Sequence, residues 1–384
     1  MDARTLVARA RDLAPTLRER ARQTELDRNV SPLVIKELQA AGLFRALQPK
    51  RYGGFELSPT AFYDAAIELG AACGSTGWVY GVVGVHAWQL ALFPLETQDE
   101  VWGEDASTLA SSSYAPTGIV EPVEGGYRLR GRWHFSSGCA HCPWVLLGGI
   151  VVRDGIPDHV TFLVPSDDYV IDDVWHVAGL AGTGSNDIVI EDAFVPTRRT
   201  QPTASLLGGA RVHENPLYQL PFASVFANAI TASTIGIGVG AVDAYREHTL
   251  QRVRASYGGE KSAADPFSQV RLAEATGELD AARLQLRRNM DELLEHAEAG
   301  REIPAELRVR IRRDQVRGSR ASLDATDRVF ESAGGRALFL DQPIQRAWRD
   351  VHAARVHAIN DFERGLLIYG THALGGTPPP GSML

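Results

Sequence analysis

The sequence predicts an α+β protein in which helical regions flank a central region of short strands. Residues 1–107 show helical periodicity, whereas residues 108–205 break into short runs with alternating or β-branched apolar side chains. Residues 206–384 contain four long amphipathic segments. We therefore expect an N-terminal α domain, a central antiparallel β barrel or sandwich, and a C-terminal four-helix bundle with a tail, divided at these residues.

The composition excludes several classes of protein. Hydrophobic residues make up 44% of the 384 residues and charged residues 22%, which is typical of a globular protein. The net charge of −8 argues against nucleic acid as a partner. Three cysteines and the lack of a signal peptide after Met1 indicate the reducing cytosol, so we expect a cytoplasmic protein. No apolar run approaches the roughly 20 residues that span a membrane, so no membrane partner is expected.

The N-terminal region has clear signals for where helices begin and end. Ser31 can cap a helix whose first turn accommodates Pro32, and Gly42 is a suitable end for that helix. Residues 49–59 are expected to form a loop before a second helical pattern. The small residues in 70–85 predict that this later helix packs closely against the backbone of its neighbours.

The central region has the pattern of buried and half-buried strands. Residues 127–133 and 187–195 alternate between polar and apolar side chains, which predicts strands with one buried face. Residues 144–152 are continuously apolar, and residues 161–164 are apolar and β-branched. Gly, Pro and Asp residues separate these runs, as in a small antiparallel barrel or sandwich.

The C-terminal bundle is predicted from four helical segments with short Gly or Pro breaks between them. These segments are residues 223–256, 269–299, 304–333 and 343–374. The arginine-rich stretch 308–320 is interpreted as a solvated or intersubunit face of a helix rather than as an anion site.

Two motifs that could bind a cofactor or a metal lack the context that they need. Gly236-Ile-Gly238-Val-Gly-Ala241 resembles the loose dinucleotide fingerprint, but no strand precedes it, so close packing of helices is the better interpretation. Cys139-Ala-His-Cys142 lacks both the second pair that a zinc site needs and the βαβ context of a redox pair. We therefore predict no metal site.

Histidine, serine and aromatic residues could form a site for a flat ligand. On the predicted helix 343–374, His357 shares a face with Asn360 and Asp361, so it is a plausible general base, although spacing alone favours a core histidine. Serines 111–113 and 136–137 fit turns or hydroxyl groups around a planar ligand. The aromatic residues of these segments, which could line a pocket or fill a core, are Trp78, Trp88, Trp133, Trp144 and Tyr114.

The succession of helical, β and four-helix regions resembles the acyl-CoA dehydrogenase fold. Gly179-Leu-Ala-Gly-Thr-Gly-Ser-Asn186 looks like the mid-domain segment of that superfamily, and Arg254-Ala-Ser-Tyr-Gly258 is similar to its arginine signature. There the arginine reaches the flavin phosphate across a subunit interface, which implies the same role for Arg254. Arg349-Asp350 matches the stretch before the dehydrogenase's catalytic glutamate, whose position holds Ala358 here. Removal of an acyl α-proton in that manner is therefore not expected.

A closer resemblance is to the oxygenase components of two-component flavin-dependent aromatic hydroxylases. It is carried by residues 47–54, 72–78, 111–116, 135–141 and 345–352. It implies that reduced FMN or FAD, delivered by a separate NAD(P)H:flavin reductase, reacts with O2 to a C4a-hydroperoxyflavin. This species would hydroxylate a phenol at the ortho carbon and give a catechol. The resemblance also implies a homotetramer.

Within this group, residues 83–86, 101–105 and 355–361 resemble most the actinobacterial hydroxylases of the phenolic A-ring of a seco-steroid. A seco-steroid A-ring is therefore the expected substrate. Two alternatives stay open, namely a tailoring hydroxylase of an aromatic polyketide and an acyl-CoA dehydrogenase-like or non-catalytic relative.

The resemblance also implies roles for individual residues. His357 matches a histidine that helps to bind and deprotonate the phenol, a task for which a base titrating near neutrality is suited. Ser137 matches a serine near flavin N5, and His86 and Ser112 match positions that line the phenol site. The residues assigned to the substrate are His86, Ser112, Tyr114 and His357, and those assigned to the flavin are Ser137, Trp133 and Arg254.

Overall fold

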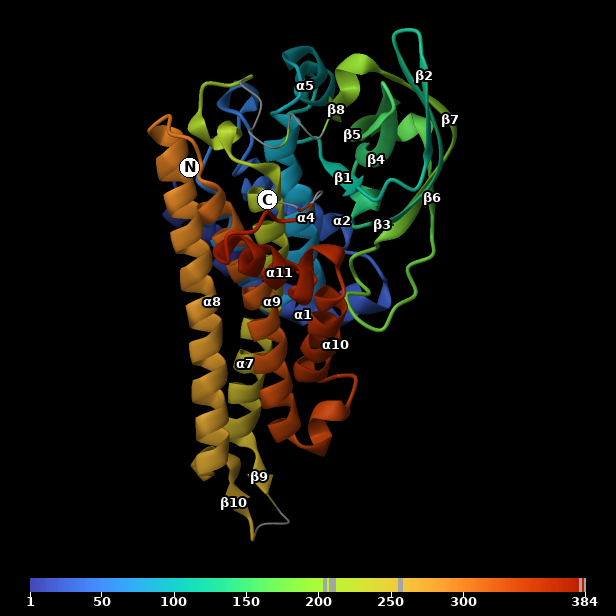
Figure 1. Ribbon diagram of the computed structural model, residues 1–384. Coiled ribbons are helices and arrows are strands. Elements are labelled where there is room, and N and C mark those ends of the chain that lie inside the picture. The colour runs from blue at the N-terminus through green and yellow to red at the C-terminus, as the bar shows by residue number, and fades with distance from the viewer. Residues whose placement is uncertain (203–205, 207–211, 255–257, 380–381, 383–384) are drawn as a thin grey trace.

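The computed structural model shows a body of helices with most of the β strands gathered at one side of it (Figure 1). It describes residues 1–202, 206, 212–254, 258–379 and 382. This order of helical, β and helical regions confirms the predicted fold class. The change from helix to strand falls between Trp102 and Ala110, and the boundary predicted near residue 107 stays a prediction. The boundary predicted at residue 205 lies outside the described residues.

The N-terminal helices begin and end largely where the sequence predicts. The backbone N–H of Val34 donates to Ser31 Oγ at 3.3 Å, and Gly42 has a φ of +76°, so both predicted ends of this helix are confirmed. The helices of this region are α1 (Ala3–Leu26), α2 (Pro32–Ala40), α3 (Pro59–Ala72), α4 (Gly74–Leu90) and α5 (Leu95–Trp102).

Helices α3 and α4 pack closely against each other and against α7 (Phe222–Gln251). Gly77 faces Gly70 so closely that a Cβ atom at residue 77 would overlap the Gly70 Cα. A Cβ atom at Gly236 of α7 would lie 2.7 Å from the Ile67 carbonyl oxygen. The glycine motif that starts at Gly236 therefore packs helices together and confirms the interpretation made from the sequence.

Two four-stranded sheets form a sandwich with a shared apolar core. One sheet has the order β1-β4-β5-β8 and the other the order β2-β3-β7-β6. Strands β1 and β4 run parallel, so the prediction of an entirely antiparallel region is wrong for this pair. The strands are β1 (Ala110–Ser113), β2 (Ile119–Val123), β3 (Gly126–Ser136), β4 (Trp144–Arg153), β5 (Ile156–Pro165), β6 (Val170–Asp172), β7 (Asn186–Pro196) and β8 (Thr200–Pro202).

The C-terminal bundle contains one more helix break than the sequence predicts. The segment predicted as one helix over residues 343–374 is two helices, separated by a turn that contains His357. Asp361 caps the second of these helices by accepting from the backbone N–H of Arg364 at 3.0 Å, and Asn360 donates to the Ala354 carbonyl at 2.8 Å. Besides α7, the bundle consists of α8 (Pro266–Glu298), α9 (Ala305–Ala333), α10 (Pro343–Arg355) and α11 (Phe362–Ala373).

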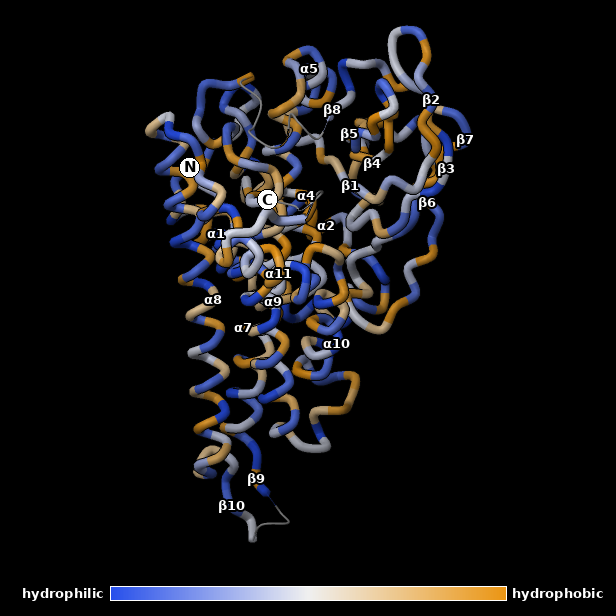
Figure 2. The backbone as a smooth tube through the Cα atoms, viewed as in Figure 1, coloured by the Kyte–Doolittle hydropathy of each residue, from blue (hydrophilic) through white to orange (hydrophobic). Residues whose placement is uncertain are grey.

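The first bundle helix is shorter than expected, because α7 ends at Gln251 rather than near residue 256. A short hairpin of β9 (Val253–Arg254) and β10 (Glu260–Lys261) follows it at the far tip of the bundle (Figure 1). Hydrophilic and hydrophobic residues alternate along α8, as expected for a helix with one buried face (Figure 2).

Helix α7 also corrects the prediction that no segment is apolar enough to span a membrane. An 18-residue window of this 30-residue helix reaches a mean hydropathy of 1.6. In the structure 89% of that window is buried inside the protein, as in the core helix of a globular domain. The sequence predicts this helix but not its high mean hydropathy, because Ser, Thr and Asn residues interrupt its apolar run.

The contact between α3 and α4 predicts opposite outcomes for two Gly→Ala substitutions. Gly77→Ala lowers the free energy of unfolding by about 1–3 kcal/mol, because the added methyl group overlaps the backbone of α3. Gly277→Ala on α8 raises it by up to about 1 kcal/mol, because no atom lies within 4 Å of that methyl group and alanine favours the helix. Denaturant titrations of both variants measure the difference, and equal stabilities would contradict the close packing.

Candidate active site

The residues assigned to the phenol and to flavin N5 form two clusters connected by α4. In the first cluster, the ring centroid of Tyr114 lies 6.2 Å from that of His86, and Ser112 of β1 lies two residues before Tyr114 in the chain. In the second, Trp78 connects Ser137 to His357. Trp78 and His86 lie eight residues apart on α4, or about 12 Å along the helix axis. One buried helix therefore places both clusters.

His86 is a buried hydrogen-bond acceptor. Its Nδ1 lies 2.7 Å from the Ala110 carbonyl oxygen, so the ring proton resides on Nδ1. Its Nε2 is buried and has no hydrogen-bond partner among the residues that the structure describes. Burial lowers the pKa of His86 to about 4, so the ring is neutral at pH 7 and Nε2 carries a lone pair. A buried acceptor of this kind suits a ligand that donates a hydrogen bond.

A chain of polar side chains fixes the direction of the Tyr114 hydroxyl. Tyr114 donates to Gln89 Oε1, and Gln89 Nε2 donates to Gln201 Oε1 at 3.2 Å. Because the Tyr114 proton is committed to Gln89, the Tyr114 oxygen can act toward a ligand only as an acceptor. The amide Gln89 is a site residue that the sequence did not reveal.

Aromatic rings surround His86 and Tyr114. Phe226 stacks on His86 with a centroid distance of 6.3 Å and meets the Tyr114 ring edge-on at 5.3 Å. Phe222 packs edge-on against Tyr114 at 5.5 Å. Both phenylalanines lie on the first turns of α7, a segment that the sequence identified as a bundle helix and not as part of the site. An aromatic enclosure with few polar groups suits a flat aromatic ligand.

His357 lies in the turn between α10 and α11, not on a helix. The backbone N–H of Ile359 donates to its Nδ1 at 3.2 Å, so the neutral ring carries its proton on Nε2 and can donate there. Burial and, to a smaller extent, the charge of Arg312 lower the pKa of His357 to about 4. The half-buried ring is thus held toward its neutral form, and its predicted role as the base for the phenol stays a prediction. The predicted pairing with Asp361 is wrong, because Asp361 caps α11.

Ser137 is held by a hydroxyl network from the segment after β6. Trp78 Nε1 donates to Ser137 Oγ at 3.2 Å, and the Trp78 ring meets that of His357 edge-on at 5.6 Å. Ser185 Oγ lies 2.7 Å from Ser137 Oγ and 2.7 Å from Thr183 Oγ1. The Gly179–Asn186 motif noted in the sequence therefore positions the serine at the predicted flavin site.

Helix α10 fixes this motif from the other side. The backbone N–H of Leu180 donates to Asp350 Oδ1 at 2.6 Å, and Arg349 Nη1 donates to the Ala178 carbonyl at 2.6 Å. A Cβ atom at Gly179 would overlap the Arg349 carbonyl oxygen. Burial raises the pKa of Asp350 to about 6. The Arg349-Asp350 pair thus connects the Ser137 network to the helix that ends next to His357.

The residues beside Ser137 fit a planar heteroaromatic cofactor. Phe135 has a φ of +67°, which is strained for a bulky side chain, and 68% of its surface is exposed. Its ring meets that of Trp175 edge-on at 6.1 Å. Two aromatic rings next to a partly exposed hydroxyl can stack on an isoalloxazine ring and hydrogen-bond to its edge. The positive φ of Phe135, which points to this site, cannot be recognised from the sequence.

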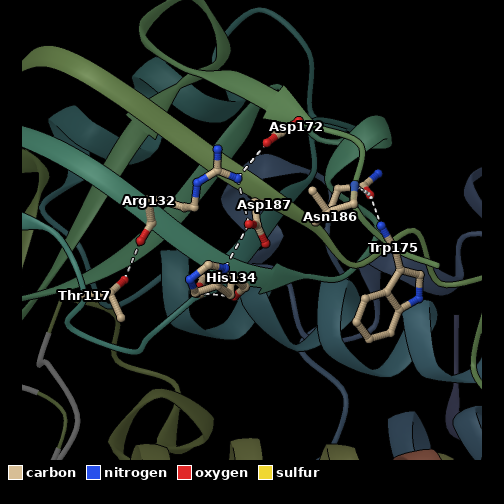
Figure 3. Close-up of polar contacts among 9 residues, drawn as sticks. Thr117, Arg132, His134, Asp172, Trp175, Asn186 and Asp187 are labelled. Atoms are coloured by element: carbon tan, nitrogen blue, oxygen red, sulfur yellow. Dashed lines mark hydrogen bonds and ion pairs between the residues drawn. The ribbon is translucent and has the colours of Figure 1, made fainter. Parts of the chain in front are cut away.

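Ion pairs and amide contacts stabilise the backbone around Phe135 (Figure 3). The buried carboxylate of Asp187 accepts from Arg132 at 2.9 Å and from His134 at 2.8 Å. Asn186 Oδ1 accepts from the backbone N–H of Trp175 at 3.1 Å. These contacts connect β3 and β7 at the register shift between Trp133 and Ser136, where the strained residue lies.

Two residues assigned to the flavin lie elsewhere. Trp133 is fully buried in the sandwich core, where its Nε1 donates to the Gly148 carbonyl at 2.7 Å. The structure therefore gives Trp133 a role in the sandwich core, and its assignment to the flavin stays a prediction. Arg254 lies in the β9–β10 hairpin at the far tip of the bundle and forms an ion pair with Asp265 at 2.8 Å. Residues 255–257 of its motif lie outside the described residues.

Comparisons with known proteins identify the fold and the family. The family described as acyl-CoA dehydrogenase, N-terminal domain, matches residues 2–107, and the one described as acyl-CoA dehydrogenase, C-terminal domain, matches residues 228–362. The chain is 48% identical to the flavin-dependent monooxygenase oxygenase subunit HsaA of Rhodococcus jostii (strain RHA1), over 94% of this chain and 96% of that protein. It is 38% identical to the FADH(2)-dependent resorcinol hydroxylase oxygenase component of Rhizobium sp. (strain MTP-10005), over 97% and 95%.

A solved structure agrees with these relatives. The crystal structure of the HsaA monooxygenase from M. tuberculosis superposes with a TM-score of 0.94 at 45% identity, over 100% of both chains. The fold is therefore that of the acyl-CoA dehydrogenases. The chain belongs to the family of flavin-dependent monooxygenase oxygenase subunits, and its cofactor and co-substrate are reduced flavin and O2.

The two histidines predict a distinctive NMR signature. Both rings stay neutral between pH 5 and pH 8, because each has a pKa of about 4 and is protonated only below that value. In ¹⁵N-histidine-labelled protein we expect His86 protonated at Nδ1 and His357 at Nε2, with assignments from His86→Asn and His357→Asn. A titration midpoint near 6.5 for either ring would contradict the burial that lowers these pKa values.

Proposed function

We propose that this oxygenase subunit hydroxylates a phenol at the carbon ortho to its hydroxyl group and gives a catechol. The unpartnered Nε2 of the buried His86 carries the proposal, because this atom requires a ligand that donates a hydrogen bond. The rings of Phe226 and Tyr114 lie around His86 and suit a flat ligand. A phenol supplies the donor and the flat ring. The name of the Rhizobium relative, a resorcinol hydroxylase, supports a phenolic substrate.

The substrate that we favour is the phenolic A-ring of a seco-steroid. Support comes from the resemblance of residues 83–86, 101–105 and 355–361 to hydroxylases of that substrate, and from the 48% identity to an HsaA oxygenase subunit. The acyl-CoA dehydrogenase-like alternative lacks its catalytic carboxylate, because exposed Ala358 stands at that position. No observation favours a polyketide over a steroid ring.

Two neutral histidines divide the work on the phenol. His86 Nε2 accepts the phenolic proton, and Ser112 lines the same site. His357 keeps its proton and would donate a hydrogen bond from Nε2–H to the phenolate oxygen. An imidazole with a pKa of about 4 is a weak base for a phenol with a pKa near ~10, so the phenolate needs further stabilisation by the protein.

Reduced flavin, when bound, supplies the activated oxygen that the phenolate attacks. Ser137 would hydrogen-bond to the flavin ring, and Phe135 and Trp175 would stack on it. Arg254 is too far along the bundle to serve the site of its own chain, so we propose that it reaches the flavin phosphate of a second copy. The rest of the chain excludes water from the phenol by enclosing His86 among aromatic rings.

We propose that a separate reductase is the partner of this chain. The name of the R. jostii relative, an oxygenase subunit, supports this proposal. We propose that this reductase oxidises NAD(P)H and that either FMN or FAD is accepted. We further propose a cytoplasmic homotetramer formed through the C-terminal bundle. Exposed apolar side chains on α8 and on the loop before α10 support burial by another copy, and they include Phe267, Leu284 and Phe339.

Flavin reoxidation tests the reaction class directly. The protein is mixed anaerobically with reduced FMN or FAD and then with O2 in a stopped-flow instrument. We expect oxidised-flavin absorbance to return more slowly than with free flavin, and a phenol to accelerate its return and yield a catechol. Reoxidation at the rate of free flavin, without catechol, would overturn the proposal. Rapid oxidation of NADH by the isolated chain would contradict a separate reductase.

His86→Asn tests the proton acceptor. The asparagine amide can still donate to the Ala110 carbonyl, but the Nε2 acceptor is lost, so we expect kcat for hydroxylation to fall by about 100-fold. The loss should shrink for phenols of lower pKa, which need less help to ionise. His296→Ala on α8, whose ring bonds the exposed Glu302 carbonyl, is the control and should retain full activity. A uniform loss with all phenols would assign His86 a structural role instead.

A further inference from the structure

Arg312 is a buried cation without an acidic partner. It lies on α9 with 6% of its surface exposed, within the stretch that the sequence predicts as a solvated or intersubunit face, so that prediction is wrong at this residue. Within the part of the chain that the structure describes, no carboxylate forms an ion pair with Arg312. Its neighbours differ, since Arg310 pairs with Glu292 and Arg313 with Asp314.

The hydrogen-bond partners of Arg312 are neutral and hold the turn that carries His357. Its Nη1 donates to the Ile359 carbonyl at 2.6 Å and to Gln315 Oε1. Gln315 Nε2 in turn donates to Asn360 Oδ1 at 2.9 Å and to Thr231 Oγ1 at 2.7 Å. Arg312 Nε is buried and has no partner among the described residues. The guanidinium therefore lies directly behind the turn between α10 and α11.

The charged groups around this turn leave the charge of Arg312 largely uncompensated. Asp361 of α11 is the acidic group whose field reaches Arg312, but its carboxylate hydrogen-bonds to the backbone N–H of Arg364 and also pairs with that side chain. Arg355 of α10 donates to the Asn360 carbonyl and pairs with Glu363 at 3.8 Å. From α7, the neutral Thr231 faces this network.

An isolated buried charge is costly, so its retention points to a function. The field of Arg312 already disfavours a positive charge on His357 and contributes to the lowered pKa of that ring. The same field favours a negative charge at that place. A phenolate oxygen that accepts from His357 Nε2 would carry such a charge.

We propose that Arg312 is a positioning residue that stabilises the phenolate form of the substrate through its uncompensated charge and fixes the turn that carries His357. This inference rests on the proposed phenol site. Arg312 supplies the stabilisation of the phenolate that the two weakly basic histidines do not provide. It does so through its electric field, without direct contact with the substrate.

The ionisation of bound 4-nitrophenol tests the inference, because its phenolate absorbs in the visible range. The probe is titrated with full-length protein without flavin, and the pKa of the bound probe is measured from the absorbance. Arg312→Gln should raise this pKa by about one unit, a roughly tenfold smaller phenolate ratio at a given pH. Arg312→Lys should restore most of the shift. Arg320→Gln, which removes an exposed charge from the same helix, should leave the pKa unchanged.

Asp361→Asn is a second variant that does not depend on how Arg312 variants fold. Asparagine also caps helices well, and removal of the acidic group strengthens the field of Arg312, so the pKa of the bound probe should fall. If neither the Arg312 variants nor Asp361→Asn moves this pKa, the inference is overturned while the phenol site stands. If wild-type protein shows no saturable binding of 4-nitrophenol, the phenol site itself is overturned.

Discussion

The close contact between the backbones of α3, α4 and α7 is the constraint on which the site depends. Glycines at the crossing points let α4 approach its neighbours, so this helix is buried along nearly its whole length. It carries Trp78 and His86 two turns apart, and both side chains are buried. Burial leaves His86 neutral and its Nε2 unpaired, a cost of about 1–3 kcal/mol that a ligand can recover.

The site also depends on the break between α10 and α11, where the sequence predicts one continuous helix. A continuous helix would turn His357 to a different face and keep its backbone groups within the helix. The turn instead brings the Ile359 N–H to His357 Nδ1 and exposes the Ile359 carbonyl to Arg312. The same helix that ends at this turn holds the Leu180 N–H through Asp350, so His357 and the Ser137 network share one support.

Periodicity and capping residues were sufficient to predict the order of the domains, the ends of α2 and the packing role of Gly236. The resemblance placed His86, Ser112, Tyr114, Ser137 and His357, which the structure arranges in two connected clusters. Sequence could not show the break at His357, because Asn360 and Asp361 fit a helix face as well as they fit a turn and a cap. The resemblance assigned Trp133 to the flavin, whereas the structure shows its side chain in the sandwich core. Gln89 and Arg312 each have a partner in a distant segment, so no local pattern reveals these contacts.

The two site histidines take their proton positions from main-chain groups, Ala110 O and Ile359 N. Main-chain groups do not change when side chains are replaced. The aromatic residues around the phenol, such as Phe222 and Phe226, can therefore vary during evolution without altering which histidine donates a hydrogen bond and which one accepts it. Substitutions of the aromatic residues that line the site can therefore change the substrate while the hydrogen-bonding roles of the two histidines stay constant. Such a fold can diversify in substrate without losing its chemistry.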